Sequence, residues 1–308
     1  MKKLITILGV FTLVMSTVSC DKITYPTKIV TELDTALFTD GQFAEYPWPV
    51  FAANTNTNRN VLIEDYTGHK CPNCPEAAEV AEALEIANPG RVFVTSIHTG
   101  AGGDGFFQSV DVSCTDQTQA FCYDFRTNEG NTYGEDFGSG FGFIGNPQGT
   151  FNRAKFGTSD MFYFKSNWGA NVNTLLNEND LKVNLQAEGN YYAASNGIYL
   201  HIQSEFIEDL TGNYNIVTYV VQNQIIEDQD VDGVFETDYH HHNVFLGCID
   251  GEAWGHAIGG TDPASGTKVQ TDYSYVLPTG LTSTDIHFLT YIYDVNSFEI
   301  LQVIKYEL

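Results

Sequence analysis

The segment that most constrains the fold is an apolar run that ends in a pair of cysteines and leads directly into a helical pattern. Residues 60–66 have the β-favouring character of a buried strand, and the turn after them carries Cys71 and Cys74 in a C-x-x-C spacing. Residues 75–88 are rich in good helix formers, and Pro75 falls in the first turn, where no N–H partner is lost. A cysteine at a helix N-terminus faces unpaired N–H groups and the positive end of the helix dipole, which favour thiolate over thiol. The segment therefore predicts a strand–turn–helix unit that presents a reactive cysteine pair.

The residues that follow complete the pattern of a thioredoxin-like domain, which we place at residues 46–180. Asn88-Pro89-Gly90 ends the helix, and residues 91–98 form a second buried strand, which is expected to lie parallel to the first. Such a fold also needs a cis-proline beside the cysteines. Pro147 is the best candidate, with a trans turn proline as the alternative. Apolar residues at helical intervals within residues 159–179 predict the helix that closes the domain.

A glycine-rich insertion, at about residues 100–145, separates the second strand from the proline and is expected to be long and irregular. It carries Cys114 and Cys122, for which an oxidising compartment predicts a local disulfide that stabilises the fold by ~2–3 kcal/mol. Reduced or differently paired thiols are the alternative. His69, just before the cysteine pair, and His98, at the end of the second strand, are candidates for a role in the same cleft, although a histidine in the position of His69 is more often a solvated flank.

From residue 181 to residue 308 the pattern becomes all β. Short runs that alternate apolar and polar residues, such as 197–202 and 287–293, are separated by turn residues. This spacing predicts an immunoglobulin-like β-sandwich. The predicted fold class is therefore an α/β thioredoxin-like domain followed by an all-β immunoglobulin-like sandwich domain. Cys248 stands alone in the second domain and is expected to be a buried small hydrophobe.

Two features of the second domain suggest metal binding. Asp228, Asp230 and Asp232 alternate before a glycine, like the start of a calcium loop, but the glutamate that ends an EF-hand loop is missing. A solvated acidic hairpin is the alternative to a calcium site. Among the three consecutive histidines, only His240 and His242 share a face of a strand and could converge on a transition metal. The cysteine chemistry itself requires no cofactor.

The N-terminus has the pattern of a lipoprotein signal peptide. Residues 1–19 combine two lysines with a short apolar run and small residues before Cys20. We expect cleavage there, attachment of lipid such as palmitate to Cys20, and a lipidated tether over residues 20–45, with an ordinary secretory signal as the alternative. Loss of Lys2 and Lys3, and of no acidic residue, takes the formal charge from −25 to −27. Such a charge argues against nucleic acid as a partner.

The chain carries three segments, at residues 61–75, 146–153 and 225–244, that together resemble the outer membrane protein 28-related family. These are envelope lipoproteins and secreted proteins of Bacteroidetes-type bacteria. The resemblance implies a thioredoxin-like domain joined to a β-sandwich and attachment to the outer membrane through the lipid anchor. It carries the family's asparagine–arginine pair over to Asn152 and Arg153, which we expect to be structural. It leaves activity open, because the family is also linked to surface adhesion.

Two hypotheses for the function follow. In the first, Cys71 attacks a disulfide of a client protein or redox partner, Cys74 resolves the mixed disulfide, and Pro147 shapes the substrate groove. In the second, the protein is a non-catalytic surface binding or adhesion lipoprotein whose cysteine pair is a structural disulfide. Exposure of the Cys71 sulfur would favour the first hypothesis, whereas capping by the insertion would favour the second, since fold alone does not decide.

Overall fold

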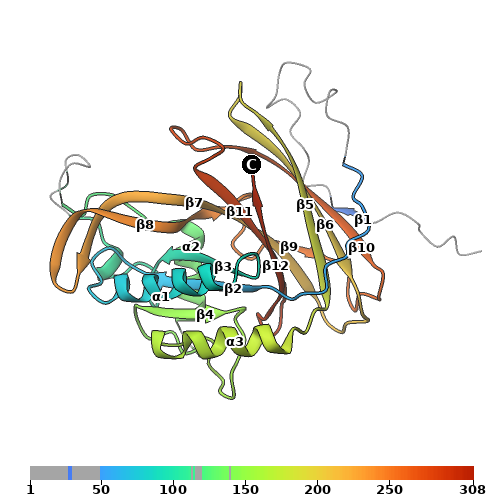
Figure 1. The fold of residues 1–308 in the computed structure, drawn as a ribbon, viewed down its shortest axis with the longest axis horizontal. Helices are drawn as coiled ribbons and strands as arrows, with labels where there is room; N and C mark the ends of the chain where they lie inside the picture. The colour runs from blue at the N-terminus through green and yellow to red at the C-terminus, as the bar shows by residue number, and fades with distance from the viewer. Residues whose placement is uncertain (1–26, 30–48, 112–113, 115–119, 139) are drawn as a thin grey trace, which may run out of the picture.

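The computed structural model describes residues 27–29, 49–111, 114, 120–138 and 140–308 (Figure 1). The predicted signal peptide, the lipidation site Cys20 and most of the tether lie outside these residues. The described part of the chain is mixed α/β, with strands predominating and three α-helices.

The first unit is a parallel strand–helix–strand arrangement, as the sequence predicts. β2 (Val61–Thr67) leads through the cysteine turn into α1 (Cys74–Ala87), and β3 (Val92–His98) returns beside β2. The two strands pair in parallel from Val61↔Val92 to Thr67↔His98. Every residue of both strands is buried, so this pair lies at the centre of the unit.

β4 (Gln148–Phe151) extends the sheet on the other side of β2. It runs antiparallel to β2, with Tyr66 opposite Gln148. The Asn146–Pro147 peptide bond just before β4 is cis, as predicted. The proline loop therefore lies beside the end of β2 from which the cysteine turn starts.

α3 (Trp168–Glu178) packs on the same face of the sheet as α1. It is preceded by the 3₁₀ turn η4 (Lys165–Asn167). The helix predicted within residues 159–179 is therefore shorter than expected at its start. Tyr163 pairs with Gly149 in an isolated β-bridge, which keeps the chain before η4 extended.

The glycine-rich insertion is less irregular than predicted, because it contains the 3₁₀ turn η3 (Phe106–Gln108) and the helix α2 (Asn128–Phe137). α2 buries Tyr133 on the face of the sheet opposite α1. A Cβ atom at Gly134 would lie 2.4 Å from both the Gly100 carbonyl oxygen and the Thr99 Oγ1. Glycine at this position lets α2 approach the backbone after β3, so part of the glycine content reflects close packing.

The remaining strands form a second, facing sheet and extend the sheet that contains β2, β3 and β4. The smaller sheet has the order β1-β10-β6-β5, and the larger has the order β12-β11-β7-β8-β3-β2-β4, with β9 paired to β7. Apolar residues of both sheets, including Ile202 of β6 and Phe288 of β11, share one core. The bounds of these strands are β1 (Thr27–Ile29), β5 (Val183–Tyr192), β6 (Gly197–Phe206), β7 (Tyr214–Val231), β8 (Val234–Cys248), β9 (His256–Ile258), β10 (Lys268–Val276), β11 (Ile286–Asp294) and β12 (Ile300–Glu307).

The two halves of the chain share the larger sheet. β8 pairs in parallel with β3 through Ser96 and Val244, so the sheet continues across the predicted boundary at residue 180. β7 and β8 are 18 and 15 residues long. In Figure 1 this hairpin extends from the facing sheets toward the side of the first unit on which α1 begins.

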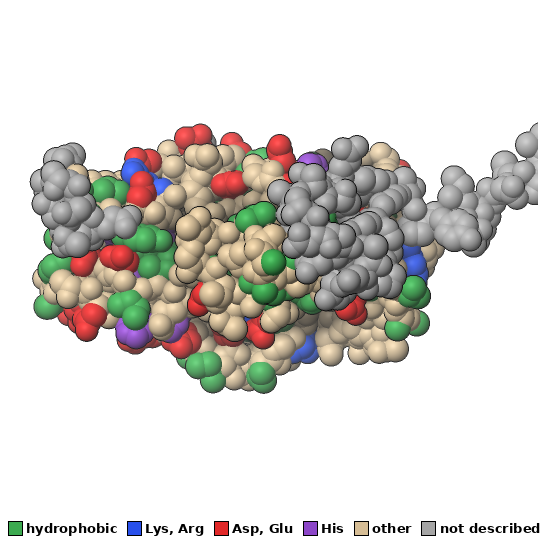
Figure 2. Space-filling view, turned by 90° about the horizontal axis from the view of Figure 1, so that it is seen from above, with side chains coloured by type: hydrophobic (Ala, Val, Ile, Leu, Met, Phe, Trp, Pro, Cys, Tyr) green, Lys and Arg blue, Asp and Glu red, His purple; other side chains and the backbone are tan. Residues whose placement is uncertain are grey.

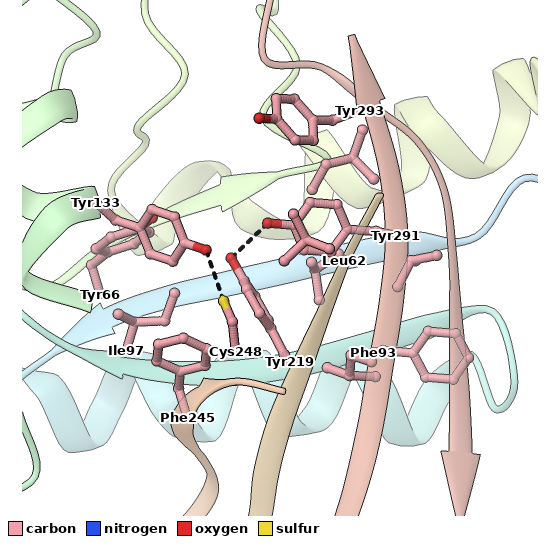
Figure 3. Packing of buried hydrophobic residues seen from close by; sticks show 14 of the residues in the cluster. Leu62, Tyr66, Phe93, Ile97, Tyr133, Tyr219, Phe245, Cys248, Tyr291 and Tyr293 are labelled. Carbon is pink, nitrogen blue, oxygen red and sulfur yellow. Dashed lines mark hydrogen bonds between the residues drawn. The ribbon is translucent and has the colours of Figure 1, made fainter. Parts of the chain in front are cut away.

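The interior where the two halves meet is aromatic (Figure 3). Leu62 and Tyr66 of β2 pack there with rings from α2, β7, β8 and β11. The Tyr291 hydroxyl donates to the Tyr219 hydroxyl at 2.9 Å. Cys248 is buried, as predicted, and forms no disulfide with any described residue; its Sγ lies 3.5 Å from the Tyr133 hydroxyl.

A fully buried ion pair crosses this interior. Arg153 donates from Nε and Nη2 to the two carboxylate oxygens of Glu64 at 2.8 and 2.6 Å, and both side chains have no exposed surface. The Tyr219 hydroxyl donates to the same carboxylate at 2.8 Å. Asn152 accepts from the Leu62 N–H at 2.7 Å through its side chain. These bonds connect β2 to the residues directly after β4 and to β7. They are consistent with the structural role expected of Asn152 and Arg153.

The surface is strongly acidic. Figure 2 shows many acidic and few basic side chains on the face seen there, consistent with the formal charge of −25. Among the described residues, no helix has both the length and the apolar character needed to cross a membrane.

Candidate functional site

The cysteine pair is a closed disulfide that the rest of the fold covers. Cys71 is bonded to Cys74 with the two Cα atoms 5.4 Å apart. Cys74 is the first residue of α1, and its N–H donates to the Cys71 carbonyl oxygen at 3.2 Å. Cys71 is 1% exposed and Cys74 is 2% exposed. The exposed sulfur that the exchange hypothesis expects is therefore not present in this arrangement.

The main cover is the end of the β7–β8 hairpin, which the sequence did not connect with the cysteines. The backbone N–H of Asp230 donates to the His69 carbonyl oxygen at 2.8 Å, and that of Asp232 donates to the Pro72 carbonyl oxygen at 3.0 Å. The buried Gln229 side chain donates to the Cys71 carbonyl oxygen at 3.1 Å. The hairpin thus satisfies three carbonyl groups of the cysteine turn.

The insertion packs against the other side of the same turn, as the sequence allows. The Lys70 N–H donates to the Phe107 carbonyl oxygen at 3.0 Å. Gln108 donates from Nε2 to the Thr67 carbonyl oxygen at 2.8 Å. A Cβ atom at Gly68 would lie 2.6 Å from the Phe107 carbonyl oxygen, so only glycine permits this approach. The insertion and the hairpin together enclose the cysteine turn.

A cavity of about 50 Å³ lies next to Cys74, between α1 and β8. It is lined by Asp65 of β2, His98 of β3 and His241 of β8. Such a volume has room for a few water molecules, since one needs roughly 10–15 Å³. The Asp65 carboxylate is fully buried and has no hydrogen-bond partner among the described residues. Burial raises the pKa of Asp65 to about 7.

Sequence reasoning missed Asp65, although a signal for it was present. The residue is a carboxylate within an otherwise apolar strand, and it has the same parity as Val61 and Ile63, which face α1. A strand buried on both faces has no solvent for a charged side chain. The position of Asp65 on the helix-facing side therefore points to the cysteine at the start of that helix.

Three histidines surround Phe125 beside the cavity. His98 stacks on the Phe125 ring at 4.3 Å, and the His241 and His69 rings lie 4.5 and 5.6 Å from it. All three histidines are buried. Burial lowers the pKa of each ring, that of His241 to about 4, so the cluster is neutral at pH 7. The alternative that His69 is a solvated flank is therefore wrong, and His98 lines the cavity beside Cys74.

An open groove of about 370 Å³ runs past the proline loop. Pro147 and Asn146 form one side, and Asn73, between the two cysteines, lies in the same groove. Phe164 also lines it and is 53% exposed. The groove combines an apolar surface with backbone close to the disulfide.

Cys114 and Cys122 form a second disulfide, with the two Cα atoms 5.6 Å apart. This disulfide lies next to the hairpin through Phe121. The Phe121 N–H donates to the Asp228 carboxylate at 2.5 Å, and the Phe121 ring lies 5.0 Å from the Phe235 ring. The insertion disulfide and the hairpin cover are therefore in contact.

The residues proposed for calcium have different partners. Asp228 accepts from Phe121, and Asp230 accepts from the Gly233 N–H at 2.8 Å. Across the described ranges, no group of three or more His, Cys, Asp or Glu side chains could hold a metal ion. The His240 and His242 rings lie 6.3 Å apart on β8. Metal binding at Asp228, Asp230 and Asp232 stays a prediction.

The comparison with known families assigns the second part of the chain. Residues 135–308, which run from α2 through β12, match the sequence model of outer membrane protein Omp28. The chain belongs to the Omp28 family. Its location is therefore the outer membrane. No curated protein matches the chain. The matched residues include Pro147, Arg153 and the hairpin, but they exclude Cys71 and Cys74, so membership of the Omp28 family assigns no chemistry to the cysteine pair.

Solved structures share the fold at low sequence identity. HBP35 of Porphyromonas gingivalis is 16% identical with a TM-score of 0.60, over 83% of this chain and 77% of that chain. A protein of Agrobacterium tumefaciens is 11% identical with a TM-score of 0.51, over 83% of this chain and 96% of that chain. A domain of the outer membrane lipoprotein Omp28 from Porphyromonas gingivalis is 16% identical over 42% of this chain and 88% of that chain, with a TM-score of 0.28. The first two similarities show a common fold, and the third carries no structural argument.

Proposed function

We propose that this Omp28-family protein is an outer membrane thiol–disulfide exchange protein whose Cys71–Cys74 pair cycles between disulfide and dithiol. The observation that carries the proposal is the buried carboxyl group of Asp65, which shares a cavity with Cys74 and has no hydrogen-bond partner among the described residues. A disulfide that only stabilised the fold would gain nothing from this group, because burying an unpaired carboxyl costs free energy. Buried groups with perturbed pKa values in a cavity are typical of functional sites.

The proposal includes the finer description of the fold as a thioredoxin-like domain followed by an immunoglobulin-like sandwich. The order of strand, C-x-x-C, helix and parallel strand supports the first part, as does the cis-proline before an antiparallel strand. The two facing sheets with one core support the second part. Attachment to the outer membrane through lipid on Cys20 completes the proposal.

The proposed exchange reaction uses the two sulfurs in turn. In the dithiol state, the Cys71 thiolate attacks one sulfur of a client disulfide, and the other client sulfur leaves as a thiolate. The Cys74 thiolate then attacks the Cys71 sulfur, which restores the Cys71–Cys74 disulfide and releases the client as a dithiol. Two electrons pass to the client. The Asp65 carboxylate takes the proton that Cys74 loses, and the N-terminus of α1 stabilises thiolate at this end of the helix.

The client segment is expected to lie in the groove beside Pro147. The groove passes Asn73, within the cysteine turn, and its exposed Phe164 offers an apolar contact. A disulfide-containing segment of an envelope protein has the chemistry that this surface requires, namely an extended backbone with apolar side chains.

The second candidate function is that of a non-catalytic surface binding or adhesion lipoprotein. The exposures of 1% and 2% at the two cysteines favour it, because a structural disulfide is typically covered. In that case the β-sandwich and the insertion supply the contact surface.

The reduction potential of Cys71–Cys74 separates the two candidates. The mature protein would be equilibrated with glutathione buffers, and the free thiols would be trapped and identified by mass spectrometry. We expect a potential between ~−120 and ~−270 mV, the range of working exchange proteins. A potential below ~−300 mV would mark a structural disulfide and leave the binding function.

The role of Asp65 has its own test. Asp65→Asn is expected to slow the Cys74 step about 10²-fold, since a positioned base typically contributes that much. Glu82→Gln is the matched control, because Glu82 lines the same cavity but is exposed. Equal rates in the two variants would show that Asp65 takes no part in the reaction.

A further inference from the structure

The end of the β7–β8 hairpin, residues 229–233, is here called the cap. Its backbone and the Gln229 side chain bond to the carbonyl oxygens of His69, Cys71 and Pro72. Cys71 is 1% exposed beneath it. A client therefore cannot reach the Cys71 sulfur while the cap is in place.

The insertion disulfide contacts the flanks of the cap through one residue, Phe121. Phe121 donates its N–H to the carboxylate of Asp228, directly before the cap, and its ring contacts Phe235, two residues after the cap. Phe121 has a φ of 52°, in the left-handed region that a phenylalanine rarely adopts. Its neighbour Cys122 is bonded to Cys114. The disulfide therefore restrains the chain directly next to the residue whose N–H contacts Asp228.

We propose that the cap is an autoinhibitory element of the exchange site, and that the Cys114–Cys122 disulfide is the redox-sensitive lock that keeps it closed. This inference rests on the proposed exchange function and names its regulation. When the lock is reduced, Phe121 relaxes to a common backbone conformation, Asp228 loses its partner, and the cap leaves the cysteine turn.

The unlocking step needs a dithiol reductant. One thiolate of the dithiol attacks a sulfur of Cys114–Cys122 and forms a mixed disulfide, and the other cysteine leaves as a thiolate. The second thiol of the reductant then displaces the protein sulfur, so that the reductant is oxidised to a disulfide and the lock gains two electrons and two protons. Cys114 is partly exposed whereas Cys71 is 1% exposed, so the lock is the more accessible of the two disulfides.

The test is the rate at which each disulfide of the mature protein is reduced by dithiothreitol. Samples would be quenched at intervals, alkylated, and analysed by peptide mass spectrometry. We expect the lock to be reduced first and Cys71–Cys74 to follow after a lag. In Cys114→Ser/Cys122→Ser the lag disappears, and the Cys71–Cys74 rate rises about tenfold, the effect of removing one bond to a charged group.

Asp228→Ala tests the same contact without touching a cysteine, and is expected to raise the Cys71–Cys74 rate by a similar factor. Asp238→Ala, at an exposed position on β8, is the matched control and is expected to leave the rate unchanged. Circular dichroism of each variant establishes that the fold is intact, and Asp228→Ala decides the outcome if the double serine variant does not fold.

Equal Cys71–Cys74 reduction rates in the wild-type protein, Asp228→Ala and the double serine variant would overturn the cap proposal. Reduction of Cys71–Cys74 before the lock would also overturn it. These outcomes are rates, whereas the proposed exchange function is tested by an equilibrium potential. A working potential with equal rates would therefore retain the exchange function and reject only its regulation.

Discussion

Glu64 and Asp65 are adjacent carboxylates on β2, and their side chains lie in different environments on the two faces of the strand. Both are fully buried. Glu64 points into the aromatic interior between the two halves, where it accepts hydrogen bonds from Arg153, Tyr219 and Thr150. Asp65 points toward α1 and accepts none from the described residues.

The two environments move the pKa values in opposite directions. Burial alone would raise the pKa of Glu64, but the Arg153 guanidinium and the hydrogen bonds lower it overall. Burial raises the pKa of Asp65 to about 7, since none of the described residues forms a compensating hydrogen bond with it. A buried carboxylate whose hydrogen bonds are satisfied is tolerated within an interface, whereas one without partners that titrates near neutral pH is suited to proton transfer.

The largest expected effect comes from breaking the satisfied pair. Arg153→Met leaves Glu64 as an uncompensated buried charge and is expected to lower the free energy of unfolding by about 3–5 kcal/mol. Urea unfolding of the oxidised protein measures this loss. The Glu64→Gln/Arg153→Met double variant is expected to lose less than the two single variants combined. Additive losses would show that the two side chains do not interact.

The second largest effect is an expected increase in the free energy of unfolding, at Asp65. The folded pKa of Asp65 is about 7, above its ordinary value of 3.8, so the folded protein keeps a proton that the unfolded chain releases. The stability from neutral Asp65 is complete below about pH 4 and is lost as the pH rises through 7. Asp65→Asn is therefore expected to stabilise the protein by about 1–4 kcal/mol at pH 8 and by little at pH 4. Unfolding curves at both pH values measure the difference, and destabilisation at pH 8 would contradict the unpaired state of Asp65.

The histidine cluster provides a smaller effect at lower pH. Burial lowers the folded pKa of His241 from 6.5 to about 4, so its contribution to stability is present above about pH 6.5 and is lost as the pH falls through 4. In the Asp65→Asn background, His241 is expected to lower the free energy of unfolding by about 1–3 kcal/mol as the pH falls from about 6.5 to about 4. The substitution His241→Gln is expected to abolish this loss. The exposed His240→Gln is the matched control, and an identical pH dependence in both variants would contradict the assignment.

The smallest effect is expected at a surface ion pair. Lys165 and Glu76 form a salt bridge with side chains that are 30% and 68% exposed. Lys165→Ala is expected to change the free energy of unfolding by about 0–1 kcal/mol, because solvent screens exposed pairs. A loss as large as that of Arg153→Met in the same urea assay would mean that burial is not what distinguishes the two pairs.

Local sequence features predicted much of the first unit. The β-favouring run, the cysteine spacing and the good helix formers correctly indicated β2, α1 and β3, because each depends on residues close together in the chain. The start of α3 was misjudged because a distant β-bridge at Tyr163 overrides the helical periodicity. The insertion was judged irregular because the glycine at position 134 permits close packing that only the folded structure reveals.

The features of the candidate site can also be divided into those set by local sequence and those set by tertiary contacts. The sequence by itself determined the cysteine pair, the proline loop and the alternation of β2, which places Glu64 and Asp65 on opposite faces. Only the tertiary structure decided that Glu64 pairs with Arg153, that Asp65 has no hydrogen-bond partner in the described part of the chain, and that the hairpin covers the cysteines. The physical reason is distance along the chain. Gln229 bonds to Cys71 across 158 residues, and no local preference encodes such a contact.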